Sequence, residues 1–202
     1  MVSEFLTFVH LGFGHILNLG AMDHILFLLA LAAIYRGRDW RDSLWVVSAF
    51  TAGHSITLAL AATGALRIPA RLTEFLIPLT IVATGIENLL VKNRPQALLR
   101  GCYRPIFAGV FGLVHGAGFA AYLQHLFAGS IIVPLFGFNA GIELGQIIVL
   151  VAAGVVLASL DRLFTVARVP GARPSPYRLR VVAVSVVVVA VATQMAAAHR
   201  PW

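Results

Sequence analysis

Six side chains that can bind a metal ion stand inside otherwise apolar stretches of the sequence: His15, Asp23, His24, His54, His115 and Glu143. An ionisable group in the middle of a lipid bilayer costs roughly 2.5–3.5 kcal/mol, so such a residue has to be explained by a partner or by a function. Neutral imidazole together with carboxylate oxygen suits divalent nickel, cobalt, zinc, iron or manganese. The residue types therefore point to a polar site for a divalent transition-metal ion, provided that the chain folds so as to gather them.

The apolar stretches are long enough to cross a membrane as helices. The chain of 202 residues is 59% hydrophobic and only 11% charged, whereas soluble domains average about 25% charged residues. Runs near or above the ~20 residues that a spanning helix needs occupy 43–64, 73–91, 105–127, 131–160 and 180–197. They are apolar on every face, unlike the alternating strands of a membrane barrel. We expect an all-α, polytopic transmembrane helix bundle that forms a single integral membrane domain over residues 1–202.

The N-terminal stretch 5–35 allows two interpretations. Its halves, 5–19 and 21–35, each hold fifteen residues, which is about 22 Å of helix against a hydrocarbon core of ~30 Å. Two short or tilted helices meeting at Gly20 would give seven spans and a cytoplasmic N-terminus, and this is the arrangement we expect. A re-entrant segment followed by one span would give six. A helix that starts after Gly20 puts Asp23 in its first turn, where free N–H groups and the helix dipole favour a carboxylate.

The net charge of +7 is unevenly distributed. Twelve of the fifteen Lys and Arg residues lie in the linkers 36–42, 92–104 and 161–180, which is the positive-inside pattern of a multi-pass protein in a bacterial-type inner (plasma) membrane. It predicts that these linkers are cytoplasmic and that the C-terminus is outside. The positive charge thus reports the topology of the chain in the membrane. We expect the lipid bilayer to be the partner of the protein. No basic patch with interleaved aromatic residues suggests that it binds nucleic acid.

On this topology the candidate ligands form a column that runs inward from the outer face. His15, Asp23 and His24 fall toward the outer half, and the other three candidate ligands fall near the middle. Additional polar residues within the spans are expected to support the column: Ser55, Glu87, Asn88, Asn139 and Gln146.

Glycines spaced as GxxxG allow helix backbones to approach closely. One such pair is Gly112 and Gly116, and a second series runs over Gly137, Gly141 and Gly145. We interpret them as packing positions that could bring the helices of His115 and Glu143 together across one interface. The same faces could also mediate a homo-oligomer.

Four ordered motifs resemble the second branch of the HupE/UreJ family of small membrane proteins, and together they cover residues 12–147: "GHILNLGAMDHILFLLAL", "AFTAGHSITLAL", "FGLVHGAGFA" and "FNAGIELGQ". Members of this family are regarded as nickel or cobalt permeases tied to hydrogenase and urease maturation. The better-studied branch carries a His-x5-Asp-His motif, which by resemblance implicates His15, Asp23 and His24. Here seven residues rather than five separate His15 from Asp23, and "FGLVHGAGFA" keeps one histidine.

The leading hypothesis is a permease that moves a divalent transition-metal ion inward, nickel or cobalt before zinc. Asp23, His15 and His24 would replace the hydration shell of the ion near the outer mouth, and His54, His115 and Glu143 would form a second, central stop. The alternative is a seven-span intramembrane zinc-dependent hydrolase, in which three histidines and an acid hold the zinc and a second acid acts as base. No two histidines stand four residues apart on one predicted helix, so we expect a transporter rather than an enzyme.

Overall fold

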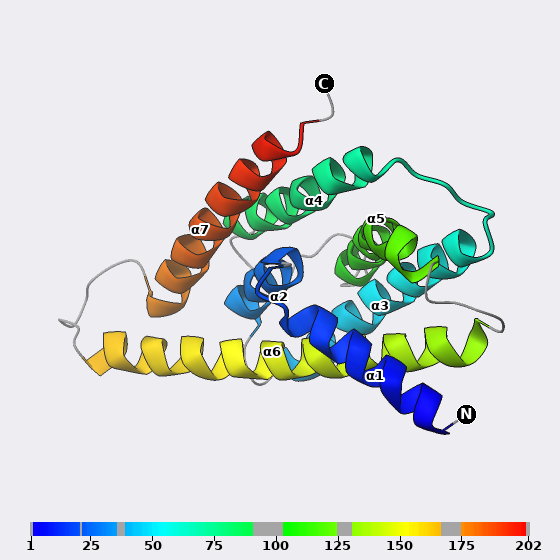
Figure 1. Ribbon diagram of the computed structural model, residues 1–202. Coiled ribbons are helices and arrows are strands. Elements are labelled where there is room, and N and C mark those ends of the chain that lie inside the picture. The colour runs from blue at the N-terminus through cyan, green and yellow to red at the C-terminus, as the bar shows by residue number, and fades with distance from the viewer. Residues whose placement is uncertain are drawn as a thin grey trace.

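The protein is a bundle of helices, and the computed structural model describes residues 2–20, 22–35, 39–90, 103–124, 131–166 and 175–200, with side chains omitted at 120–124, 164 and 166. Within these ranges there are no strands, which confirms the all-α fold (Figure 1). The helices are α1 (Val2–Leu17), α2 (Met22–Ile34), α3 (Trp40–Ala62), α4 (Ala70–Leu90), α5 (Tyr103–Gln124), α6 (Ile132–Val166) and α7 (Pro176–Ala198).

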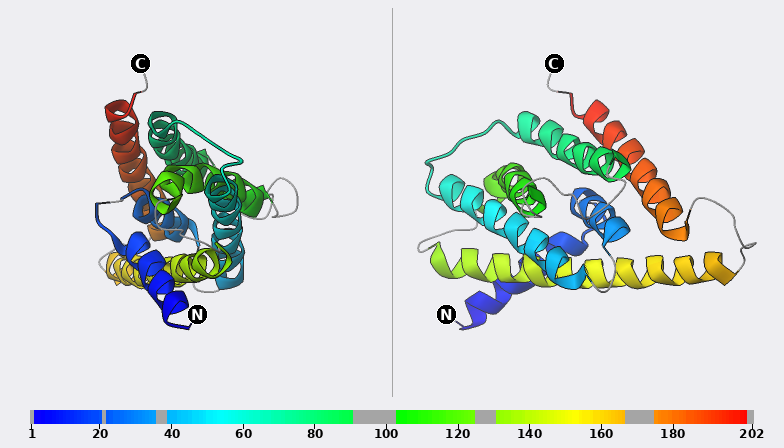
Figure 2. Two further views of the ribbon diagram at one scale, coloured as in Figure 1. Left: turned by 45° about the vertical axis from the view of Figure 1, so that its right-hand side comes forward. Right: turned by 180° about the vertical axis from the view of Figure 1, so that it is seen from behind.

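The helices associate mainly in three pairs, α3 with α5, α1 with α6, and α4 with α7, while α2 lies in the middle of the bundle (Figures 1 and 2). The first two pairs depend on glycine. A Cβ atom at Gly112 would lie 2.1 Å from a backbone oxygen of α3, and one at Gly141 would lie 2.0 Å from a backbone oxygen of α1. Only glycine permits so close an approach of two backbones, so the GxxxG series are packing positions, as predicted.

The glycines do not, however, bring the helices of His115 and Glu143 together, and that expectation was wrong. Gly112 and Gly116 face α3, and the glycine series of α6 faces α1. The interfaces therefore join the helix of His115 to that of His54, and the helix of Glu143 to that of His15. Since both glycine faces are covered within one chain, a homo-oligomer would need another surface.

Helix directions follow from the same contacts. Phe5 lies beside Gly137 and Ile16 beside Gly145, so α1 runs parallel to α6. The start of α7 meets the ends of α2 and α4, where Tyr177 donates a hydrogen bond to the carbonyl of Ile34 (3.0 Å) and Arg178 to that of Leu89 (2.7 Å). The helices α2, α4 and α6 therefore end, and α3, α5 and α7 begin, at one end of the bundle. We call it the basic end, because the arginine- and lysine-rich linkers attach there.

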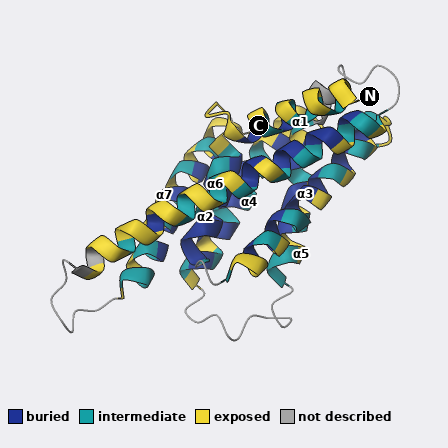
Figure 3. Ribbon diagram, turned by 90° about the horizontal axis from the view of Figure 1, so that it is seen from below, coloured by how far each residue is buried: buried dark blue, intermediate teal, exposed yellow. Residues whose placement is uncertain are grey.

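The chain begins at the opposite end from the basic end. The helix α1 starts level with the start of α6, and both labelled termini lie toward the upper edge in the view of Figure 3. The helices α1 and α2, with 16 and 13 residues, are each too short to cross a bilayer. Together they pass as one span bent by 71° at the break. By length and composition this matches the alternative in which residues 5–35 cross the membrane once, rather than the two short spans that we expected.

Four further helices of the described chain, α3, α4, α6 and α7, are long and apolar enough to span a membrane. The helix α5 is not among these candidates, although its 22 residues extend about 33 Å at ~1.5 Å per residue, which is sufficient by length alone. Large apolar side chains cover the outside of the bundle, as on α6, where Val155 and Val156 are 61% and 57% exposed (Figure 3). An apolar exterior around a buried polar interior is the arrangement of a multi-pass membrane protein.

Candidate metal centre

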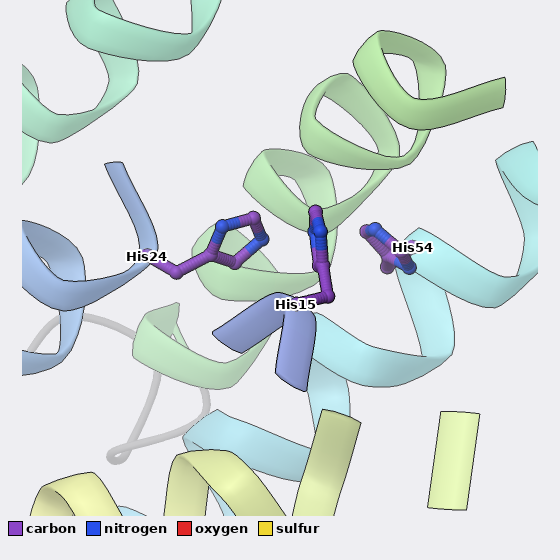
Figure 4. Close-up of side chains that lie close together, drawn as sticks. All are labelled: His15, His24 and His54. Atoms are coloured by element: carbon purple, nitrogen blue, oxygen red, sulfur yellow. The ribbon is translucent and has the colours of Figure 1, made fainter. Parts of the chain in front are cut away.

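Three histidines from three different helices meet in the interior. His15 comes from the last turn of α1, His24 from the first turn of α2, and His54 from the middle of α3 (Figure 4). One ligand nitrogen of each lies within 4.8 Å of those of the other two. The ring centroid of His15 is 4.8 Å from that of His24 and 6.5 Å from that of His54. The 71° bend between α1 and α2 produces this juxtaposition, because it turns the end of one helix and the start of the next toward α3.

A fourth histidine adjoins the three. The ring of His115 on α5 has its centroid 5.4 Å from that of His24. Its Nδ1–H donates to the carbonyl oxygen of Phe111 at 2.8 Å, which leaves Nε2 with a free lone pair. We refer to His15, His24, His54 and His115 as the histidine cluster.

Five ring nitrogens of the histidine cluster are buried without a well-aligned hydrogen-bond partner: His15 Nε2, His24 Nε2, His54 Nδ1, His54 Nε2 and His115 Nε2. The Asn139 side chain lies beside His54. A buried polar atom without a partner costs about 1–3 kcal/mol, and native structures contain few of them. Neutral His54 keeps a proton on one of its two nitrogens, so four lone pairs are concentrated in one place, which is unfavourable unless they serve a ligand. A metal cation is the ligand that unprotonated imidazole nitrogens bind best.

Asp23 orients the cluster from behind. Its Oδ1 accepts the ring Nδ1–H of His24 at 3.1 Å and the backbone N–H of the same residue at 2.9 Å. A carboxylate on the far nitrogen of a histidine fixes its tautomer and its ring orientation and makes the other nitrogen a better ligand. The first-turn position predicted for Asp23 is confirmed. In this geometry Asp23 is the hydrogen-bond partner of His24 and does not stand beside it as a further metal ligand.

Aromatic rings enclose the cluster on two sides. Toward the basic end, Phe27 and Phe50 stack with their centroids 4.9 Å apart. On the opposite side, Phe119 and Phe138 stack at 5.1 Å, and Phe119 lies 4.1 Å from the ring of His15. Four rings that carry no hydrogen-bonding groups thus line the site, so the histidine nitrogens and the buried Oδ1 of Asn139 beside His54 are the groups that could coordinate an ion there.

Glu143 lies outside this constellation. Its Oε1 accepts a hydrogen bond from Ser48, one to two helical turns from His54 along α3, and the neighbouring Gln146 accepts one from Thr51 at 3.0 Å. The structure therefore does not divide the candidates into an outer site and a central site. All four histidines form one cluster, and Glu143 takes part in a separate polar contact between α3 and α6.

The remaining polar residues predicted to support the site have local partners. Ser55 donates to the carbonyl of Thr51 (2.6 Å), Asn88 to that of Ala30 (2.8 Å), and Asn139 to that of Leu135 (2.8 Å). Glu87 pairs with Arg104 at 2.5 Å.

Sequence reasoning did not identify the phenylalanines, although their spacing is visible in the chain. Phe27, Phe50 and Phe111 each stand three or four residues from a histidine of the cluster, toward the basic end. Each therefore shares a helix face with that histidine.

Comparison with known proteins identifies one family. The family model described as HupE / UreJ protein matches residues 1–200. Searches among curated proteins and among solved structures found no significant match.

Proposed function

The chain belongs to the HupE/UreJ family, and on that premise we propose that it is a permease for a divalent transition-metal ion, with nickel or cobalt as its cargo. The observation that carries the proposal is the histidine cluster, in which four imidazoles from four helices present unpaired nitrogens to one another inside a membrane bundle. The family supports metal transport as the purpose of that cluster. The positive-inside pattern puts the basic end in the cytoplasm, and we propose that the ion moves toward that end.

The geometry of the cluster is close to that of a metal site. Ligand nitrogens in a tetrahedral site with bonds near 2.1 Å lie about 3.4 Å apart, whereas those of His15, His24 and His54 are spread over as much as 4.8 Å. A small inward movement of the rings would complete the coordination shell. A permeation site must bind an ion well enough to admit it and weakly enough to release it.

The chemistry of the ligands supports nickel, cobalt or zinc over harder cations. Imidazole nitrogen suits Ni, Co and Zn, while Mg and Ca prefer oxygen. The one carboxylate in contact with the cluster, Asp23, lies on the far side of His24. A bound divalent ion would therefore be surrounded by four neutral imidazole ligands, and the one negative charge near them would be that of Asp23.

The alternative of a zinc-dependent hydrolase gains no comparable support. Such an enzyme needs an acid beside the metal-bound water to act as base. Among the described residues, the two acids that could fill this role are engaged elsewhere, Asp23 with His24 and Glu143 with Ser48.

The test is uptake of radioactive nickel and cobalt by cells or proteoliposomes that contain the wild-type chain or single variants. His24→Ala and His54→Ala should reduce uptake to the background of empty membranes, because each removes a ligand from the cluster. His10→Ala is the matched control, since His10 is an exposed histidine on α1, and it should transport normally. Size-exclusion profiles establish that each variant is folded. Wild-type uptake by folded His24→Ala and His54→Ala would refute the proposal.

A further inference from the structure

A second feature with charged residues lies nearer the basic end than the histidine cluster. A pocket of about 20 Å³ opens between α2, α3, α4 and α5, which is room for a water-sized occupant. Most of its wall is apolar, including Phe27, Leu31, Val46 and Phe111, and its charged lining residues are Glu87 and Arg104.

The pocket and the histidine cluster share a wall. Phe111, which lines the pocket, accepts the hydrogen bond from the ring of His115 (2.8 Å). Phe27, which also lines it, has its centroid 6.4 Å from the ring of His115. Phe27 follows His24 by three residues and Phe111 precedes His115 by four, so on both helices the pocket lies toward the basic end of the cluster.

Aromatic rings separate the two spaces. Phe50 stacks on Phe27 at 4.9 Å and lies 5.0 Å from His115, and both phenylalanines are 2% exposed or less. The rings therefore lie between the imidazole of His115 and the pocket that Phe27 lines. The wall is thus placed as a barrier between an ion on the histidines and the basic end.

The ion pair in the pocket stands where helix stability would not place it. Glu87 is in the last turn of α4 and Arg104 in the first turn of α5, and the helix dipole disfavours a carboxylate at a C-terminus and a cation at an N-terminus. Their side chains are 20% and 18% exposed, and a partly buried ion pair adds little net stability. The guanidinium of Arg104 occupies the place that a cation would take beside the carboxylate.

We propose that this pocket is a second cation site on the release path, in which Glu87 receives the divalent ion after the Phe27–Phe50 barrier opens. Arg104 is its built-in competitor, because it returns to Glu87 and displaces the ion toward the basic end. The inference rests on the proposed permease function and extends it. In this proposal the ion leaves the nitrogen ligands of the histidine cluster for the oxygen ligand of Glu87. The second site binds the ion more weakly than the first.

Binding of Co²⁺ to the purified protein tests the competition. Wild-type protein should bind a single equivalent, at the histidine cluster. Arg104→Gln frees the carboxylate and should bind a second equivalent, which the double variant Glu87→Gln/Arg104→Gln should lose. No second equivalent in folded Arg104→Gln, or its persistence in the double variant, would overturn the proposal.

Transport assays distinguish a failure of the second cation site from a failure of the permease function on which it rests. Glu87→Gln and the double variant should lower the rate of nickel uptake by about tenfold or more, equal to about 1.4 kcal/mol in the barrier, while Co²⁺ still binds at the cluster. Asp161→Asn is the matched control, because it removes the carboxylate of another arginine pair, with Arg180 (2.7 Å), at the basic end. Normal uptake by both Glu87 variants overturns the second site alone. Absence of uptake by the wild-type chain overturns the permease function itself.

Discussion

Replacement of Asp23 by asparagine tests how the histidine cluster is held ready for a metal. Asp23 accepts two hydrogen bonds from His24, one from the ring at 3.1 Å and one from the backbone at 2.9 Å. Asparagine has nearly the same shape and can keep both bonds, but it lacks the negative charge. Hydrogen bonds to an ionised acceptor are about twice as strong as neutral ones. The asparagine variant should therefore hold the His24 ring less firmly in its orientation.

Loss of the negative charge of Asp23 should lower the metal affinity of the histidine cluster. Removal of a partner behind a metal-ligating histidine typically costs 10–100-fold in affinity, which is about 1.4–2.7 kcal/mol. Asp23→Asn should therefore bind Co²⁺ about 10–100-fold more weakly, measured by isothermal titration calorimetry on the detergent-solubilised protein. The visible absorption spectrum of the bound Co²⁺ should keep its shape, because the ligand atoms themselves do not change.

Two results would refute this reasoning. An affinity within about twofold of wild type would mean that Asp23 does not support the cluster. A changed Co²⁺ spectrum would mean that Asp23 is itself a ligand. Glu143→Gln serves as the comparison, since its carboxylate bonds Ser48, and the Co²⁺ affinity of this variant should match that of wild type.

Two further predictions concern the fold. Gly12→Ala should lower the melting temperature through about 1–3 kcal/mol of overpacking, because its Cβ would lie 2.0 Å from a backbone oxygen of α6. Gly14→Ala is the control and should leave the melting temperature unchanged, because the space around Gly14 is open. Equal melting temperatures of the two variants would contradict the parallel α1–α6 contact. In a cysteine-free background, Ser3→Cys and His199→Cys should react with a membrane-impermeant thiol reagent from the same side and Arg41→Cys from the other; labelling of Ser3→Cys and His199→Cys from opposite sides would contradict the six-crossing topology.

Much of the fold was accessible from the sequence because its signals are local. Runs of some twenty apolar residues predict spanning helices whatever their neighbours are, and glycine spacing predicts close contacts. Which helices meet is not a local property, so the partners of Gly112 and Gly141 could not be read from the chain. The same limit affected residues 5–35, where only the contacts of Phe5 and Ile16 with α6 reveal that α1 runs toward the basic end.

The site was predicted in its residue types but not in its arrangement. Depth along each predicted span separated His15 and His24 from His54 and His115, because that estimate treats every helix as straight and perpendicular to the membrane. The bend between α1 and α2 brings all four to one place. The roles of Asp23 and Glu143 depend on which group each carboxylate meets, His24 in one case and Ser48 in the other.

The central claim is that imidazole nitrogens from separate helices converge on one metal ion. Anomalous diffraction at the cobalt or nickel absorption edge, from crystals grown with that metal, tests this claim most directly. We expect one strong peak among His15, His24 and His54, about 2.1 Å from a nitrogen of each. A peak at Glu143 and Ser48 with none at the histidines, or no ordered metal at concentrations that saturate binding in solution, would contradict it.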